Sequence, residues 1–326
     1  MEKLTKYIVA FILLIIIALT SFILWYNLPD TNGGWKKFDG NPVLGGNLGT
    51  AFDVSVLRED DLYRMWFSWR PKKSIALTES SDGINWSNPI IVLKPNLSSG
   101  WESRVNRPVV LKHSDLYHMW YTGQTDDNSY IGYATSPDGI TWTRTGDKPV
   151  LYPDQPWEKV AVMVPHVIWD ENEKIYKMWY SGGEQYEPDA IGYATSVDGY
   201  KWKKHQDPVF LPSNDKGWDG YKVTGGQVIQ LDGWYVMFYI GFENIDRAMI
   251  GLARSPDGVD NWERHPANPI IKPGKYRNWD SSAVYKPYAV KSGKLWKLWY
   301  NGRHNSVEQI GMAIHKGEKL GFEKNY

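Results

Sequence analysis

A unit of about 60 residues is repeated five times along this chain, and the repeat limits the folds that the chain can adopt. The first mark of each copy is an aromatic pair, found at Trp66-Phe67, Trp120-Tyr121, Trp179-Tyr180, Phe238-Tyr239 and Trp299-Tyr300. The second mark is an isoleucine about ten residues later, found at Ile75, Ile131, Ile191, Ile250 and Ile310. Four copies then have an Asp-Gly turn, at Asp82, Asp138, Asp198 and Asp257. Marks in a fixed order at this period indicate a repeat architecture in which each unit is one supersecondary element.

Within a unit, the hydrophobic pattern has a period of two. Residues 175–180 and 191–196 are short β-rich runs bounded by Gly, Asp, Asn and Pro, as expected for strands. About 60 residues accommodate four such strands, and a four-stranded antiparallel sheet repeated around an axis is a propeller blade. The sequence therefore predicts an all-β fold, a five-bladed β-propeller with four-stranded antiparallel blades.

The two ends of the repeat region are complementary. The fifth unit stops shortly after Phe322, before a fourth strand, whereas residues 35–44 resemble the fourth-strand region 142–151 of the second unit. We therefore expect residues 35–44 to complete the fifth blade and to cover an edge that would otherwise be unpaired.

The first 30 residues form a separate region. No charged residue occurs between Tyr7 and Pro29, and this stretch is long enough to cross a hydrocarbon core of about 30 Å. Lys3 and Lys6 precede it, which favours a cytoplasmic N-terminus. We predict a cytoplasmic segment at 1–6, a transmembrane anchor at 7–28, a linker at 29–34 and the propeller at 35–326. The bilayer is then a partner, and the propeller lies outside the cytoplasm. A cleaved signal peptide is the alternative.

The composition narrows the range of partners. The chain has 37 basic and 37 acidic residues, so it has no electrostatic footprint for nucleic acid. It has no cysteine and needs no disulfide. The sequence suggests neither a metal nor a cofactor. Most of the 18 Trp and 21 Tyr are expected to fill the wedges between blades, and those in variable loops are candidates for stacking on sugar rings. The loop tyrosines are Tyr130, Tyr186, Tyr221, Tyr276 and Tyr285.

The inner strands differ from one another at equivalent positions. The position before the inner-strand Pro, or its equivalent where the Pro is missing, holds Asp53, Arg107, Val164, Gly225 and Lys286, and His166 lies two residues further along in the third unit. Buried repeat positions should be similar and apolar, so these differences predict a ligand site at one mouth of the central channel. The alternative is a salt-bridge network of Asp53, Arg107 and Lys286 that fills the channel.

The loops on the same face add further polar residues. We expect Glu184, Tyr285 and Arg303 on the wall of the site, and Glu102, Glu158 and Asp280 as additional substrate-binding residues. The last three each follow a Trp, and such a repeated pair also suits a structural hydrogen bond between blades.

The motif at 131–142, its copies, and Met-Trp-Tyr-Ser-Gly-Gly at 178–183 resemble the five-bladed propeller glycosidases, which include families 43, 62, 32, 68, 117 and 130. This resemblance extends from Trp35 to Tyr326. It implies action on glycans through an acid and a base that flank the glycosidic bond.

The resemblance carries over to only some residues. Asp53 matches the general base of family 43, but Arg107 stands where the second blade of such enzymes has an Asp. The general acid has no counterpart near Val164-Pro165, and Glu184 is the proposed substitute, with Glu158 and Glu102 as alternatives. A cluster of Arg107, His166, Lys286 and Arg303 would also suit an anionic sugar or the phosphate used by family 130.

We therefore expect a membrane-anchored extracytoplasmic protein that acts, as a glycoside hydrolase-like enzyme, on a surface polysaccharide or exopolysaccharide. The first alternative is a non-catalytic propeller that binds carbohydrate or assists polysaccharide assembly. The second is a structural subunit that uses the rim of the propeller to bind protein.

Overall fold

The computed structural model describes residues 7, 10–18, 20 and 29–322. Contacts divide the chain into one unit ending at Asp30 and a second beginning at Thr31. Of the described residues of the first unit, 7, 10–18 and 20 are helical, and Pro29 and Asp30 are not. Among all the described residues, no helix has both the length and the apolar character needed to cross a membrane. Much of the predicted anchor, including residues 21–28, lies outside the described residues, as does the predicted cytoplasmic segment 1–6.

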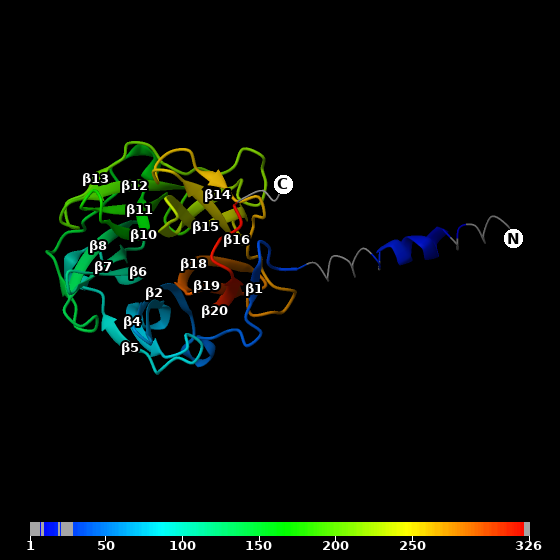
Figure 1. Cartoon of the computed structure of the whole chain (residues 1–326), viewed down its shortest axis with the longest axis horizontal. Coiled ribbons are helices and arrows are strands. Elements are labelled where there is room, and N and C mark those ends of the chain that lie inside the picture. The colour runs from blue at the N-terminus through cyan, green and yellow to red at the C-terminus, as the bar shows by residue number, and fades with distance from the viewer. Residues whose placement is uncertain (1–6, 8–9, 19, 21–28, 323–326) are drawn as a thin grey trace. The chain divides into compact units, whose positions relative to one another are not determined.

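Within residues 29–322 the strands form five blades, arranged around a centre with the first strand of each blade innermost (Figure 1). The first blade contains β2 (Ala51–Glu59), β3 (Leu62–Trp69), β4 (Ser74–Ser80) and β5 (Ile90–Leu93). The second contains β6 (Arg104–His113), β7 (Leu116–Gln124), β8 (Ser129–Ser136) and β9 (Thr143–Arg144). The third contains β10 (Ala161–Asp170), β11 (Ile175–Gly183), β12 (Ala190–Ser196) and β13 (Lys203–Lys204).

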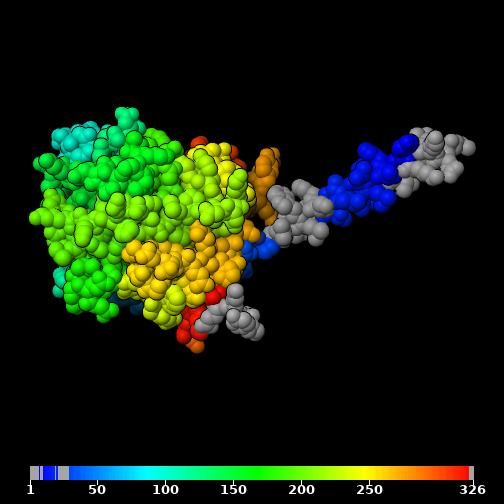
Figure 2. Space-filling view, turned by 90° about the horizontal axis from the view of Figure 1, so that it is seen from above, coloured from blue at the N-terminus to red at the C-terminus, as the bar shows by residue number. Residues whose placement is uncertain are grey.

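The fourth blade contains β14 (Lys222–Leu231), β15 (Trp234–Asn244), β16 (Arg247–Ser255) and β17 (Glu263–Arg264). The fifth contains β18 (Ala283–Ser292), β19 (Leu295–His304), β20 (Val307–Lys316) and β1 (Trp35–Lys37). Short 3₁₀ turns occur at η1 (Gly46–Leu48), η2 (Arg70–Lys72), η3 (Leu97–Ser99) and η4 (Pro156–Glu158). Figure 2 shows the side of the propeller on which the third and fourth blades, coloured green to yellow, are packed together. The predicted all-β propeller with antiparallel blades is therefore confirmed.

The fifth blade is completed from the start of the propeller. β1 pairs antiparallel with β20, and Trp35 is opposite His315. A further bridge joins Leu44 to Ile310. This pairing confirms the prediction from the complementary ends, and it covers the outer edge of the fifth blade.

The repeated Trp residues hold neighbouring blades together. The indole N–H of each donates to a glycine carbonyl in the Asp-Gly turn of the next blade, at 2.7 to 3.0 Å: Trp66 to Gly139, Trp120 to Gly199, Trp179 to Gly258 and Trp299 to Gly83. The Trp299 bond joins the last blade to the first. The fourth copy is Phe238, which has no N–H and packs edge-on against Trp35 with ring centroids 5.9 Å apart. The ring therefore closes with the same contact that joins three of its internal blade pairs.

The acidic residues that follow Trp in the loops stabilise single blades. Glu102 accepts a hydrogen bond from the Tyr121 hydroxyl at 2.7 Å, and its carboxylate lies 2.6 Å from the guanidinium of Arg144 on the fourth strand. Equivalent buried sets, each within one blade, are Glu158 with Tyr180 and Lys204, Asp219 with Tyr239 and Arg264, and Asp280 with Tyr300 and Lys37. The expected blade-to-blade bond is therefore wrong.

These carboxylates also do not reach the central cavity. Glu102, Glu158 and Asp280 are buried, with residue exposures of 1%, 0% and 2%, and each is paired with a cation on the fourth strand of its own blade. They are consequently not retained as substrate-binding residues. Their role is to attach the short fourth strand to its blade.

Candidate active site

Every inner strand is interrupted by a bulge at the same place. The pairing register of each first strand with its second strand shifts over three residues, for example between Phe52 and Ser55. At the bulge, Asp53, Arg107, Val164 and Lys286 have φ angles of 50° to 54°. Non-glycine residues rarely adopt this conformation, and bulges redirect side chains. The sequence positions that break the repeat are thus the positions at which the backbone is unusual.

Polar side chains from the preceding blade support four of these bulges. The backbone N–H of the bulged residue donates to a side-chain oxygen at 2.7 to 3.2 Å: Arg107 to Ser68, Val164 to Thr122, Gly225 to Ser181 and Asp53 to Asn301. The equivalent residue facing the fifth bulge is Ile240, whose side chain has no acceptor. Backbone strain persists only where the surroundings fix it, and these bonds supply that restraint.

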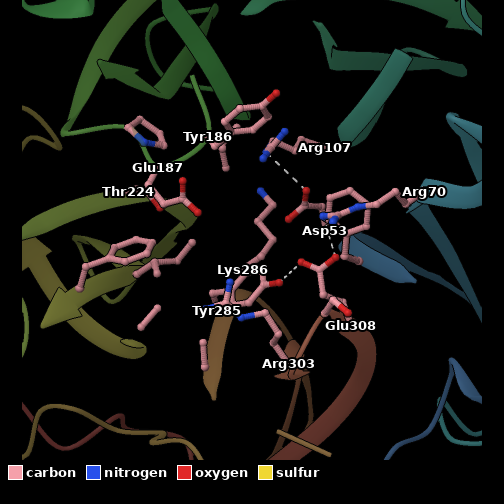
Figure 3. Close-up of a pocket in the computed structure, with 18 of the residues that line it drawn as sticks. Asp53, Arg70, Arg107, Tyr186, Glu187, Thr224, Tyr285, Lys286, Arg303 and Glu308 are labelled. Carbon is pink, nitrogen blue, oxygen red and sulfur yellow. Dashed lines mark hydrogen bonds and ion pairs between the residues drawn. The ribbon is translucent and has the colours of Figure 1, made fainter. Parts of the chain in front are cut away.

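A cavity of about 510 Å³ opens at this end of the channel (Figure 3). Five of the ten predicted site residues line it: Asp53, Arg107, Tyr285, Lys286 and Arg303. They come from β2, β6, β18 and β19, so three blades bring together residues that are far apart in the sequence. The loop between β11 and β12 adds Tyr186 and Glu187.

Asp53 is buried in the wall of the cavity. One carboxylate oxygen lies 3.4 Å from Nε of Arg107, and the other accepts a hydrogen bond from the Asn301 amide at 3.2 Å. The alternative of a salt bridge therefore holds for Asp53 and Arg107. This ion pair nevertheless faces the cavity, where both residues remain available to a ligand.

Lys286 is the most distinctive cation of the site. Its side chain extends into the middle of the cavity (Figure 3), although the residue is only 2% exposed. Burial lowers its pKa to about 8, an effect that Asp53 opposes and Arg107 reinforces. No hydrogen bond or ion pair ties its ammonium group to another side chain within residues 29–322. A buried cation without a close counter-ion is costly in a folded protein, so its position favours an anionic ligand.

Glu308 is a site residue that the sequence analysis missed. It lies on β20, is 5% exposed, and accepts a hydrogen bond from the Tyr285 hydroxyl. Its other oxygen is 2.7 Å from the guanidinium of Arg70. Burial raises its pKa, and this effect outweighs Arg70 and Tyr285, which both favour the ionised form. Such a carboxyl group is suited to hold a proton.

Glu308 also occupies a position at which the five repeats differ. The residue two positions before the repeated isoleucine differs in every copy: Lys73, Ser129, Asp189, Ala248 and Glu308. The third strands therefore break the repeat as clearly as the inner strands do.

His166 lies deeper in the channel, below the cavity. Its Nε2 is 2.8 Å from the carbonyl oxygen of Val228, and its ring is 6.0 Å from that of Tyr288. Burial lowers its pKa to about 3, so the ring is neutral. A residue two positions along a strand is displaced by about 6 to 7 Å, and at that level side chains fill the channel. His166 therefore helps to close the channel and does not line the cavity.

Glu184 is on the outer rim. Its side chain is 57% exposed and lies 2.5 Å from Nζ of Lys222 and 3.4 Å from Nζ of Lys159. The hydrogen bond from Lys222 lowers its pKa, which is unfavourable for a proton donor. Glu184 is therefore not retained as the general acid. Its loop neighbours Tyr186 and Glu187 are the ones that reach the cavity.

The described residues contain no group of three or more His, Cys, Asp or Glu side chains placed to hold a metal ion.

Known proteins resemble the chain in both sequence and fold. A 1,2-beta-oligomannan phosphorylase of Thermoanaerobacter sp. (strain X514) is 28% identical over 239 residues, which cover 68% of this chain and 73% of the relative. A beta-1,2-mannobiose phosphorylase of the same organism is 28% identical over 139 residues, which cover 38% of this chain and 45% of that protein.

Solved structures share the fold at low sequence identity. A glycoside hydrolase is 22% identical with a TM-score of 0.69, and the match covers 86% of this chain and 91% of that one. A beta-1,2-mannobiose phosphorylase from Listeria innocua, solved with beta-1,2-mannobiose, is 14% identical with a TM-score of 0.67, covering 86% and 96%. The family model for glycosyl hydrolases family 43 matches residues 40–316, nearly the whole propeller. The chain therefore belongs to glycosyl hydrolases family 43.

Proposed function

We propose that the propeller cleaves a glycosidic bond of a mannose-containing oligosaccharide and transfers the sugar to phosphate. The observation that carries this proposal is the cation pair in the cavity: Lys286 has no close counter-ion among the described residues of the propeller, and Arg107 lies beside it in the wall. Arginine and lysine are the side chains that bind phosphate through charge-assisted hydrogen bonds. The relative that is 28% identical over 68% of this chain is named as a 1,2-beta-oligomannan phosphorylase.

In this reaction a phosphate oxygen attacks the anomeric carbon, the bond from that carbon to the glycosidic oxygen breaks, and the leaving oxygen takes up a proton. Phosphate is already an anionic nucleophile, so the step needs no general base. One proton donor is still required for the leaving oxygen, and the expected third-blade acid is absent. Glu308 supplies that proton, since burial raises its pKa. Asp53 holds Arg107 against the phosphate and accepts hydrogen bonds from sugar hydroxyls.

Hydrolysis is the second candidate. It is favoured by the presence of two carboxyl groups, Asp53 and Glu308, on the wall of one cavity. A raised pKa on Glu308 beside an ion-paired Asp53 resembles the acid and base of a glycosidase. Asp53 would then activate a water molecule, and Glu308 would protonate the leaving group.

One experiment distinguishes these reactions. The full chain is incubated with beta-1,2-mannobiose and with longer beta-1,2-oligomannan, with and without inorganic phosphate, and the products are separated by chromatography. Phosphorolysis gives mannose 1-phosphate only when phosphate is present, whereas hydrolysis gives free mannose in both conditions. If the sugar binds but is not cleaved in either condition, the carbohydrate-binding alternative replaces the enzyme. The variant Glu184→Gln should give the same products as the wild type, because this carboxylate is outside the cavity.

We also propose that residues 7–28 anchor the protein in a membrane, with the propeller outside the cytoplasm and acting on a surface polysaccharide or exopolysaccharide. The support is the uncharged stretch with Lys3 and Lys6 on its N-terminal side. Protease added to intact cells or spheroplasts should digest the propeller. Digestion that occurs only after lysis would contradict this orientation.

A further inference from the structure

The cavity has one apolar wall, and this wall comes mainly from the fourth blade. Ile240 and Phe242 on β15 and Ala248 on β16 line it, together with Ala283 of β18. These four side chains form one cluster, against which Tyr285 packs. The opposite side of the cavity carries Asp53, Arg107 and Glu308.

The other blades have different residues at the equivalent positions. Ile240 corresponds to Ser68, Thr122, Ser181 and Asn301. Phe242 corresponds to Arg70, Gln124, Gly183 and Arg303. Ala248 corresponds to Lys73, Ser129, Asp189 and Glu308. Apart from Gly183 these residues are all polar, so at these three repeat positions only the fourth blade has apolar side chains throughout.

This substitution removes a structural bond. Ser68, Thr122, Ser181 and Asn301 each accept the backbone N–H of the bulge in the next blade. Ile240 cannot do so for Lys286, which has the same strained backbone. The fold itself therefore favours a polar residue at position 240. An apolar residue there is better explained by what the cavity binds.

We infer that the sugar bound in this cavity carries a methyl-terminated substituent on the edge that faces the fourth blade, and that a 6-deoxyhexose is the simplest such sugar. A hydroxymethyl group pressed against Ile240, Phe242 and Ala248 would lose its water without gaining a partner. A methyl group at the same place gains from burial. An O-acetyl group offers the same methyl terminus. This inference rests on the proposed function, because it specifies the substrate of the same site.

The test compares ligands that differ only at carbon 6. Calorimetry with the full chain, in phosphate buffer, measures the binding of methyl β-D-mannopyranoside, its 6-deoxy form and its 6-O-acetyl form. We expect the 6-deoxy or the 6-O-acetyl glycoside to bind about tenfold more tightly than the parent, and the better of the two identifies the source of the methyl group. If the parent binds as well as both, the inference fails while the proposed function stands. If none of the three binds, both fail.

Two variants connect this preference to the wall. Ile240→Thr restores the type of residue that the second blade has, and Ala248→Ser adds a single oxygen, as Ser129 does in that blade. Each should bring the dissociation constant of the parent mannoside close to that of the glycoside that the wild type binds most tightly. Thermal unfolding verifies that each variant folds, and the smaller change at Ala248 gives a result if Ile240→Thr does not fold. An unchanged ratio in a folded variant would overturn the inference.

Discussion

The contacts between blades and the mouth of the channel are built from the same repeat but have diverged differently. Between blades, Trp66, Trp120, Trp179 and Trp299 make one kind of bond, and even the closing contact follows this pattern. At the channel mouth, equivalent positions hold an acid, two cations, a valine and a glycine. The first region is largely uniform, because each contact joins two similar blades. The second needs difference, because one ligand contacts several blades at once.

The two regions also differ in how their polar groups are satisfied. The indole N–H groups of the four repeated Trp residues and the carboxylates of the Trp-acid pairs have partners within the protein. At the channel mouth, and as far as residues 29–322 are concerned, Lys286 is buried without a close counter-ion and one carboxylate oxygen of Asp53 accepts no hydrogen bond. Unsatisfied buried groups reduce stability, so they are expected where binding requires them. The uniform region therefore stabilises the fold, and the varied region gives up stability for a ligand.

The largest effect should follow from opening the ring. Deleting residues 31–45 removes β1 and the Leu44 bridge, which leaves β20 as an exposed edge and uncovers Trp296 and Phe238. We expect loss of the cooperative unfolding transition, measured by calorimetry or near-UV circular dichroism. Deleting residues 1–30 is the matched control, because contacts divide the chain at Asp30. A cooperative transition that survives the first deletion would contradict the structural role of β1.

The variant Asp53→Asn tests the role of the channel mouth in catalysis without changing the contacts between blades. It removes the charge that orients Arg107 while preserving the shape of the side chain. We expect the rate of cleavage to fall by at least about 100-fold, with little change in the unfolding temperature. Glu184→Gln should leave the rate within about twofold, because Glu184 is on the rim. If Asp53→Asn and Glu184→Gln change the rate equally, the reaction does not take place in this cavity.

Lys286→Met should separate binding from stability. Burial lowers the pKa of Lys286 from 10.5 to about 8, and each unit corresponds to about 1.4 kcal/mol. The variant should therefore be more stable than the wild type by roughly 3 kcal/mol at pH 7, although phosphate binding is lost. Urea unfolding and phosphate titration measure these two quantities. A variant that is less stable than the wild type would show that the ammonium group is better satisfied than its surroundings indicate.

The same residue sets a pH dependence. Below pH 8 the ammonium is charged and binds phosphate, so activity at subsaturating phosphate should fall as the pH rises through 8. Between pH 8 and 10.5 the unfolded chain binds more protons than the folded chain, so this lysine's destabilising contribution decreases as the pH rises. The stability advantage of Lys286→Met should shrink over the same range.

How far each region could be predicted from sequence reflects the same contrast. The fold and its closure followed from the repeated pairs and from the match of residues 35–44, because periodic signals add over five copies. Asp53, Arg107 and Lys286 were found because they depart from that period on the inner strands. Glu308 lies on a third strand, so the differences among the inner strands give no sign of it. The sequence analysis placed His166 at the cavity because alternation along a strand predicts which side a residue faces. Alternation does not predict how deep in the channel the side chains fill the space.

The loops were harder still. Glu184 and Glu187 are three residues apart in one loop, and only Glu187 faces the cavity. No periodic pattern decides which side chain of a loop points inward. Here the choice depends on Lys222, which pairs with Glu184 and also donates to the backbone carbonyl of Glu187. That contact joins the third blade to the fourth and could not be read from either unit alone.

The smallest effect should distinguish one interblade bond from another. Trp299→Phe removes the only indole hydrogen bond to the Gly83 carbonyl among the described residues, whereas the Gly199 carbonyl also accepts from Trp202 at 3.0 Å and so keeps a donor in Trp120→Phe. We expect Trp299→Phe to cost about 1 to 3 kcal/mol of unfolding free energy and Trp120→Phe to cost less, because only the first leaves a buried carbonyl unpaired. Phe238 shows that the fold accepts a phenyl ring at this repeat position. Cleavage rates should be unchanged in both variants, since neither residue lines the cavity. Equal costs would mean that the packing of the indole ring, and not its N–H, joins the blades. The uniformity of the contacts between blades would then have a purely steric cause.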